Sequence, residues 1–341
     1  MIPIFDGHND ALTREGRGDL ARRSGQGHLD LPRMREGGMR GGIFAIFTPS
    51  PGEEAHQISF DAEGSYSEPL AEPVAHDVAA AHAGATAKCL LDLEHRGEVV
   101  VARSIADLDA ARDGRAPAAV MHLEGAEAID EDLQELDAWY GRGLRSLGPV
   151  WSRPNAFAHG VPFAFPSSPD IGPGLTGRGV ALVTACAELG ILVDLSHLNE
   201  AGFRDVARLE PGPLVASHSG AHAICPASRN LTDRQLDAIG ASGGLVGIVF
   251  ATPFLRPDFA DDPETPLALI AAHGRHVADR IGVAHVALGS DFDGATIPAA
   301  LGDAAGLPRL LTALEAEGFD DAEIEAICWG NWRRVLDAWW R

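Results

Sequence analysis

The sequence has few of the residues on which disulfide scaffolds, zinc ribbons and transmembrane proteins depend. Its four cysteines, Cys89, Cys186, Cys225 and Cys328, lie far apart, and no Cys-x-x-Cys pair occurs, so a zinc ribbon and a thioredoxin-type motif are excluded. We expect these cysteines to be buried, reduced thiols. The sequence also lacks any apolar run of about 18 residues, the length that a membrane-spanning helix needs.

Basic residues are scarce as well. Lys and Arg total 27 against 49 Asp and Glu, which gives a formal net charge of -22 at pH 7. Such a charge repels phosphate backbones and anionic membrane surfaces, so we expect neither a nucleic-acid partner nor a membrane partner. The first residues form an apolar run without the basic stretch and long apolar stretch of a leader peptide. We therefore expect a cytoplasmic protein.

Apolar residues make up 45% of the 341 positions, which is ample for a large core. Short runs rich in Val, Ile, Leu and Phe recur along the chain, and each is followed by a polar break and then a helical pattern. These runs predict strands at residues 2–5, 42–48, 118–123, 144–150, 191–195, 213–217, 244–250 and 285–289. Eight strand-helix units predict an α/β fold, a (β/α)8 TIM-type barrel, in a single domain over residues 1–341. A doubly wound open sheet is the alternative.

Two long segments interrupt the repeat of strand and helix. Residues 49–73 follow the second predicted strand, and residues 152–174 follow the fourth. In a barrel both would be extended loops on the face where the strands end and where active sites lie. We therefore expect these two segments to form lids or walls of a substrate site.

Residue types that bind metals follow five of the predicted strands. They are His8 and Asp10 after the first strand, Glu124 after the third, His197 after the fifth, His218 after the sixth and Asp291 after the eighth. A single histidine or aspartate at a strand end is usually a hydrogen-bonded loop residue or a helix cap. Because the strands of a barrel end at one mouth, these side chains are expected to converge, and their combination favours a metal site.

The number of candidate ligands points to more than one metal ion. One zinc ion needs only three protein ligands and an open position, whereas five ligands with a bridging carboxylate suit two ions roughly 3.5 Å apart. Glu124, which comes from a middle strand, is the natural bridge. The only lysine, Lys88, lies in a predicted helix, so a modified lysine is not available for that position. Histidine and carboxylate ligands accept zinc and also other divalent metals.

Nearly the whole chain is spanned by short motifs that together resemble one known family. In order they are Phe5-Asp6-Gly7-His8-Asn9-Asp10, Glu124-Gly125, Asp194-Leu195-Ser196-His197, Ser217-His218-Ser219, Ser228-Arg229-Asn230 and Gly289-Ser290-Asp291-Phe292-Asp293-Gly294. The family is that of the membrane (renal) dipeptidases, binuclear zinc peptidases of peptidase family M19 with an amidohydrolase-like fold. The resemblance implies that His8, Asp10 and Glu124 bind one zinc ion and that Glu124, His197 and His218 bind the second.

The resemblance also implies an activity and two further roles. The protein would be a metallo-dipeptidase that hydrolyses L-L dipeptides, and L-Xaa-D-Xaa dipeptides as well, by a hydroxide held between the two zinc ions. Asp291 matches the catalytic aspartate, which moves a proton, and Arg229 matches the arginine that binds the substrate carboxylate. A planar guanidinium suits that task because it binds a carboxylate through two parallel hydrogen bonds. Relatives are often dimers, so the resemblance is compatible with a homodimer.

The sequence departs from the family at the end of the fourth strand. Trp151 stands where the family usually has a histidine that contacts the substrate near the scissile carbonyl. Its indole offers one N–H and no charge, so we expect Trp151 to be a substrate-binding residue that changes selectivity without affecting metal binding. His159 could reach the site instead. This departure keeps open a binuclear hydrolase of another small amide, such as an N-acyl amino acid; a non-catalytic metal-binding barrel is the remaining alternative.

Overall fold

The computed structural model describes residues 2–14, 19–50 and 58–340, and it contains a strand at each of the eight predicted positions. These strands are β1 (Ile4–Asn9), β2 (Met39–Phe47), β5 (Ala118–Glu124), β6 (Leu144–Gly148), β8 (Leu192–Val193), β9 (Val215–Ser219), β10 (Leu245–Ile248) and β11 (Val286–Leu288). All lie in the interior, and their residues are almost entirely buried. Strands that are covered on both faces read as continuous apolar runs, which is why the sequence predicts them well.

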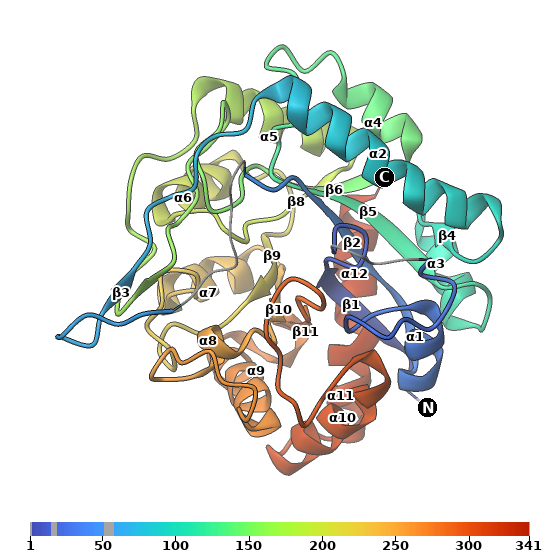
Figure 1. Ribbon diagram of the computed structural model, residues 1–341, viewed down its shortest axis with the longest axis vertical. Coiled ribbons are helices and arrows are strands. Elements are labelled where there is room, and N and C mark those ends of the chain that lie inside the picture. The colour runs from blue at the N-terminus through green and yellow to red at the C-terminus, as the bar shows by residue number, and fades with distance from the viewer. Residues whose placement is uncertain (1, 15–18, 51–57, 341) are drawn as a thin grey trace.

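The strands form two parallel sheets that close on each other. Strands β1, β2, β5, β6 and β8 are neighbours in one sheet, and β9, β10 and β11 form the other. Single bridges, Asp194 with Val215 and Asn9 with Phe292, join the sheets at both seams. Figure 1 shows the resulting ring of strands with the helices outside it. The predicted barrel is confirmed, and the alternative open sheet is wrong.

Helices cover the outside of the ring. Their bounds are α1 (Leu31–Gly37), α2 (His76–His95), α3 (Ile105–Arg112), α4 (Leu136–Arg142), α5 (Gly177–Leu189), α6 (Glu200–Leu209), α7 (Asp233–Ala241), α8 (Thr252–Leu255), α9 (Leu267–Ile281), α10 (Leu307–Ala316), α11 (Asp321–Glu325) and α12 (Asn331–Trp339). Local chemistry sets several boundaries: α7 begins after Thr232, whose hydroxyl accepts from the N–H of Gln235 while the Gln235 amide oxygen accepts from Thr232. Helix α5 ends at Gly190, whose φ of 77° is a left-handed conformation that glycine adopts without strain.

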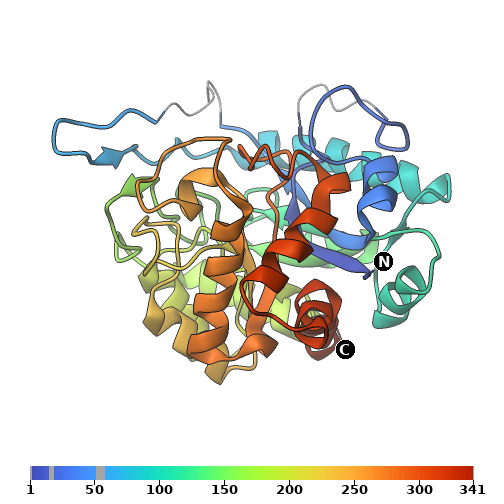
Figure 2. The same cartoon turned by 90° about the horizontal axis from the view of Figure 1, so that it is seen from below.

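Buried apolar residues from all parts of the chain, from Ile4 to Trp340, pack into one large core. The last helix contributes Trp332, whose indole N–H donates to the carbonyl of Leu288 at 2.9 Å and whose ring lies 5.7 Å from that of Phe5. Figure 2 shows the long loops gathered at one end of the barrel, whereas the C-terminus lies toward the other end. The last helix therefore does not cover the end of the barrel at which the long loops lie.

The two long loops pair with each other, which the sequence did not predict. Strand β3 (Tyr66–Ser67) lies in the first loop and pairs antiparallel with β7 (Ala164–Phe165) in the second. A further short strand, β4 (Val100–Val101), pairs with β5. Residues 51–57 of the first predicted loop lie outside the described residues. The described parts of both loops line one cavity, the first through Ile58 and Tyr66 and the second through Phe163, as predicted for walls of a site.

Candidate metal centre and active site

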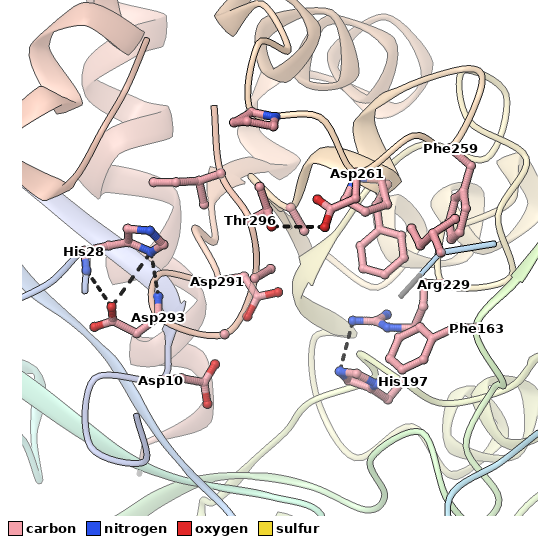
Figure 3. Close-up of a pocket in the computed structure, with 18 of the residues that line it drawn as sticks. Asp10, His28, Phe163, His197, Arg229, Phe259, Asp261, Asp291, Asp293 and Thr296 are labelled. Carbon is pink, nitrogen blue, oxygen red and sulfur yellow. Dashed lines mark hydrogen bonds and ion pairs between the residues drawn. The ribbon is translucent and has the colours of Figure 1, made fainter. Parts of the chain in front are cut away.

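A cavity of about 740 Å³ opens where the barrel strands end. Six of the eight residues that the sequence singles out line it, namely Asp10, Glu124, Trp151, His197, Arg229 and Asp291. Figure 3 shows Asp10 and Asp291 on one side of the cavity and His197 with Arg229 on the other. The strand ends thus converge on one mouth, as the barrel predicts.

The five predicted metal ligands meet around the carboxylate of Glu124. Glu124 Oε2 lies 3.5 Å from His8 Nε2, and the same nitrogen lies 3.5 Å from Asp10 Oδ2. Glu124 Oε1 faces the other way and lies 3.1 Å from His197 Nε2 and 3.5 Å from His218 Nε2. The two oxygens of one carboxylate therefore belong to two separate ligand sets, and the atoms of each set lie within 4.8 Å of one another.

Buried nitrogen atoms without partners show that this cluster fits metal ions. Both ring nitrogens of His8 are buried and have no hydrogen-bond partner among the described residues. Burial lowers the pKa of His197 to about 4, with the charge of Arg229 acting in the same direction, and burial lowers the pKa of His218 well below its usual value. These imidazoles are neutral, which is the form that binds metals. Their Nε2 atoms are only 3.1 Å apart, a contact that suits two ligands of one ion.

Serine hydroxyls orient two of the histidines. His197 Nδ1 lies 2.8 Å from the hydroxyl of Ser152, and His218 Nδ1 lies 2.8 Å from that of Ser217. The Ser217 hydroxyl donates to Asp194, so it accepts the Nδ1 proton of His218. Such contacts fix the tautomer and leave Nε2 free to bind a metal. Ser217 and Asp194 belong to the motifs of the sequence, whereas the contact of Ser152 with His197 was not predicted from the sequence.

His122 is a further buried histidine near the site, and the sequence did not predict it as a site residue. Its ring lies 5.6 Å from that of His8, and its Nε2 lies 3.8 Å from Asp194 Oδ2. Beside the two sets around Glu124, two further groups have the geometry of possible ligands: His8, His122 and Asp194, and His8, His218 and Asp291. A usable signal was present, since His122 precedes Glu124 by two residues on β5, and residues at that spacing face the same side of a strand.

Asp291 lies beside Asp10 in a conformation that few non-glycine residues adopt. Its φ is 60°, and its N–H donates to the carbonyl of His8 at 3.0 Å, which anchors the turn to the first strand. A Cβ added at Gly294 would collide with carboxylate oxygens of both Asp10 and Asp291, so the turn requires glycine there. Burial, followed by the charge of Asp10, raises the pKa of Asp291 to about 8. This carboxyl group can therefore hold a proton near neutral pH.

Arg229 brings the only guanidinium among the described residues that line the cavity. The side chain is 5% exposed, and its Nη2 lies 3.1 Å from His197 Nε2. Its Nε is buried and has no partner among the described residues, and burial lowers the pKa of the group to about 10. A buried, charged group with an unused donor facing a cavity is suited to bind an anion.

Trp151 lines the cavity, as the sequence predicts, and its ring lies 5.7 Å from that of His197 and 4.8 Å from that of Phe47. His159, the alternative, is half-buried and is not among the described residues that line this cavity. Three of the four cysteines are buried, and Cys89 is half-buried.

Behind Trp151, a buried ion pair joins the loops that follow β5 and β6. Arg153 is fully buried, and its Nε donates to Glu127 at 2.8 Å. We expect Arg153→Ala to lower the free energy of unfolding by about 3–5 kcal/mol, because Glu127 would remain as an unpaired buried charge. Chemical denaturation with urea measures this change.

A surface ion pair provides the control for this prediction. Arg178 contacts Glu131 at 2.6 Å, and the two side chains are 56% and 52% exposed. Arg178→Ala should change the free energy of unfolding by less than about 1 kcal/mol. Equal losses in the two variants would contradict the structural role of the Arg153 pair.

Comparison with known proteins identifies the family. The profile of the membrane dipeptidase family, peptidase family M19, matches residues 1–339. The chain belongs to this family. Its members are metallopeptidases that hydrolyse the peptide bond of dipeptides, and the resemblance stated from the motifs is confirmed.

Individual relatives agree with this membership. The crystal structure of a metallopeptidase, dipeptidase AC, covers 99% of both chains at 47% identity with a TM-score of 0.93. A metallopeptidase of Rhodobacter sphaeroides, solved with a phosphinate mimic of the dipeptide L-Ala-D-Ala, covers 99% of both chains at 46% identity, also with a TM-score of 0.93. A protein of Klebsiella pneumoniae encoded in the pqqA 5' region is 47% identical over 72% of this chain and 90% of its own length. Within the described residues, no helix has the length and apolar character needed to span a bilayer.

Proposed function

We propose that this dipeptidase works with two divalent metal ions, zinc in the first place, and that its substrates are dipeptides with a free C-terminal carboxylate. The observation that carries the proposal is the placement of Glu124, whose two oxygens face two separate ligand sets. The phosphinate mimic of L-Ala-D-Ala bound by the Rhodobacter sphaeroides relative supports L-Xaa-D-Xaa dipeptides as substrates beside L-L dipeptides. A homodimer and a cytoplasmic location stay predictions from the sequence.

The residues present fit such a metal pair. His8 and Asp10 with Glu124 would hold one ion, and His197 and His218 with Glu124 would hold the other. When bound, the metal ions supply Lewis-acid activation of water and of the peptide carbonyl. Ser152 and Ser217 keep His197 and His218 in the tautomer that binds a metal, as their contacts with Nδ1 indicate.

Three residues of the chain would act on the substrate. Arg229 binds the C-terminal carboxylate and thereby positions the scissile bond at the ends of the strands. Asp291 takes the proton of the attacking water and delivers it to the amine that leaves, which would otherwise depart as an unstable anion. Trp151 covers the His197 side of the cavity and excludes water there.

Removal of metal is expected to destabilise the fold. Chelation should lower the melting temperature by about 5 °C when free zinc was in thousandfold excess over its dissociation constant, because binding to the folded state alone would then contribute about 4 kcal/mol. Differential scanning calorimetry with and without a chelator measures this shift, and added zinc should reverse it. An unchanged melting temperature would contradict the metal site.

Replacement of Arg229 should lower kcat/KM only for substrates that carry a free carboxylate. In Arg229→Gln we expect kcat/KM for a dipeptide to fall by about 10- to 100-fold, which corresponds to the loss of charge-assisted hydrogen bonds. The matching dipeptide amide, which has no carboxylate, should lose little. An equal loss for the acid and the amide would show that Arg229 does not bind the carboxylate.

A substrate panel tests the proposed function as a whole. Zinc-loaded protein is offered L-Ala-L-Ala, L-Ala-D-Ala and N-acetyl-alanine, and product formation is followed. We expect hydrolysis of the dipeptides and none of the acyl amino acid. Turnover of N-acetyl-alanine alone would overturn the dipeptide assignment and move the substrate class to acyl amino acids.

A further inference from the structure

The cavity has two chemically different walls. One wall is aromatic and is formed by Phe47, Tyr66, Trp151, Phe163, Phe254 and Phe259. The other wall is acidic and contains Asp10, Asp291 and Asp293, with His28 beside them, whereas Asp261 lines the cavity nearer to Phe259. Figure 3 shows Phe163 and Phe259 on the side of Arg229, whereas Asp10, Asp291 and Asp293 lie on the opposite side. A dipeptide in this cavity would therefore meet different surroundings at its two ends.

Two of the rings stand next to the guanidinium of Arg229. The Phe254 ring centroid lies 5.6 Å from the Arg229 Cζ atom. Phe163 stacks on Phe254 with a centroid distance of 6.0 Å and an interplanar angle of 18°. Phe163 also meets the edge of the Trp151 ring at 5.8 Å. Both phenylalanines are only half-buried, so part of each ring is open to the cavity.

The neighbours of Arg229 in the sequence hold these two rings in place. Asn230 Nδ2 donates to the carbonyl of Phe254 at 2.9 Å. On the other side, the Ser228 hydroxyl accepts from the N–H of Ala164 at 3.1 Å, and Ala164 follows Phe163 directly. The three residues Ser228, Arg229 and Asn230 thus connect the carboxylate anchor to both ring-bearing segments. These hydrogen bonds hold the two ring-bearing segments at a set distance from the Arg229 guanidinium.

We propose that Phe163 and Phe254 form the subsite for the side chain of the C-terminal substrate residue, and that the enzyme therefore prefers dipeptides ending in a large apolar residue. The inference rests on the proposed function, since Arg229 must bind the carboxylate. The side chain of that residue branches from the carbon next to the carboxylate, so it must lie within one side-chain length of Arg229. The Phe254 ring lies at such a distance, 5.6 Å from Arg229 Cζ, and Phe163 stacks on it.

The acidic wall strengthens this preference. The Asp261 carboxylate is held by the hydroxyls of Thr252 and Thr296 at 2.8 and 3.1 Å, and it faces the same cavity as Asp291. An ammonium group at the N-terminal end of the substrate is favoured beside Asp10 and Asp291 on the opposite side. An acidic side chain at the C-terminal residue would meet repulsion from Asp261 and no hydrogen bonds from the rings. Dipeptides that end in aspartate should therefore be poor substrates.

The test compares two substrates in the same enzyme preparation. Zinc-loaded wild-type protein and Phe254→Ala are each given L-Ala-L-Leu and L-Ala-Gly in competition, and the ratio of the two kcat/KM values is determined. The ratio does not depend on the fraction of correctly folded protein, so a partly misfolded variant remains informative. Phe165→Ala is the matched control, because this ring stacks on Phe259 at 5.2 Å but is not among the described residues that line the cavity.

We expect the wild-type ratio to favour L-Ala-L-Leu by at least about tenfold, the ratio to fall by about tenfold in Phe254→Ala, and no change in Phe165→Ala. Hydrolysis of both dipeptides with a wild-type ratio near one would overturn the subsite while the proposed function stands. A ratio that Phe254→Ala leaves unchanged would also overturn it. If the wild-type protein hydrolyses neither dipeptide, the proposed function fails, and the subsite fails with it.

Discussion

Glu124→Gln is expected to reduce kcat/KM for dipeptides by about a thousandfold or more. An amide cannot place an anionic oxygen in both ligand sets, whereas the Glu124 carboxylate lies 3.5 Å from His8 Nε2 through one oxygen and 3.1 Å from His197 Nε2 through the other. The loss corresponds to several kcal/mol of transition-state stabilisation by the metal pair. Bound metal, measured by elemental analysis of the dialysed protein, should fall below two ions per chain.

The same chemical change on the surface provides the control for this variant. Glu188 is an exposed residue of α5, so Glu188→Gln should leave both the rate and the metal content at wild-type values. A Glu124→Gln variant that still binds two metal ions and keeps its rate would contradict the bridging role.

Asp291→Asn should lower kcat by about 100- to 10,000-fold, the range that general acid-base catalysis contributes. Asparagine has nearly the same shape as aspartate but can neither accept the proton of water nor deliver one to the leaving amine. The backbone N–H of residue 291 would still donate to the carbonyl of His8, so the turn is retained. Steady-state kinetics with a dipeptide measures the change.

Metal content separates this effect from damage to the metal site. Asp291→Asn should bind as many metal ions as the wild type, because both ligand sets around Glu124 are complete without Asp291, although Asp291 also lies within ligand distance of His8 and His218. Unchanged turnover in Asp291→Asn would show that another group transfers the proton. A joint loss of metal and turnover would assign Asp291 to metal binding instead.

The sequence predicts the barrel and the positions of the ligands for the same physical reason. Barrel strands are buried on both faces, so they appear as isolated apolar runs, and the residue that follows each run lies at the mouth. This is why residues as distant in sequence as His8 and Asp291 could be expected at one site.

Other features depend on contacts between loops, which have no periodic pattern. The pairing of Tyr66–Ser67 with Ala164–Phe165 joins segments that are about 100 residues apart, and each strand is too short to produce an alternating signal. The hydrogen bond of Ser152 with His197 and the stacking of Phe163 on Phe254 are likewise set by the paths of separate loops. Such contacts depend on tertiary packing and leave no local pattern in the sequence.

Trp151 was singled out from the sequence, and its contacts are known from the structure. The sequence identifies the missing histidine, and the structure places the indole against His197 and Phe163. Trp151 is thereby part of the aromatic wall of the cavity and lies next to the metal ligands without being one. The candidate ligands remain grouped around Glu124 beside the indole, so we expect Trp151 to affect the substrate and not metal binding.

A zinc titration tests directly whether dipeptide hydrolysis depends on two bound metal ions. Metal-free protein is titrated with zinc, and hydrolysis of L-Ala-L-Leu is followed at each addition. For a two-metal site we expect activity to rise until two equivalents of zinc are bound and then to reach a plateau. Full activity at one equivalent would contradict the two-metal site, and the absence of dipeptide hydrolysis at every zinc concentration would contradict the proposed function itself.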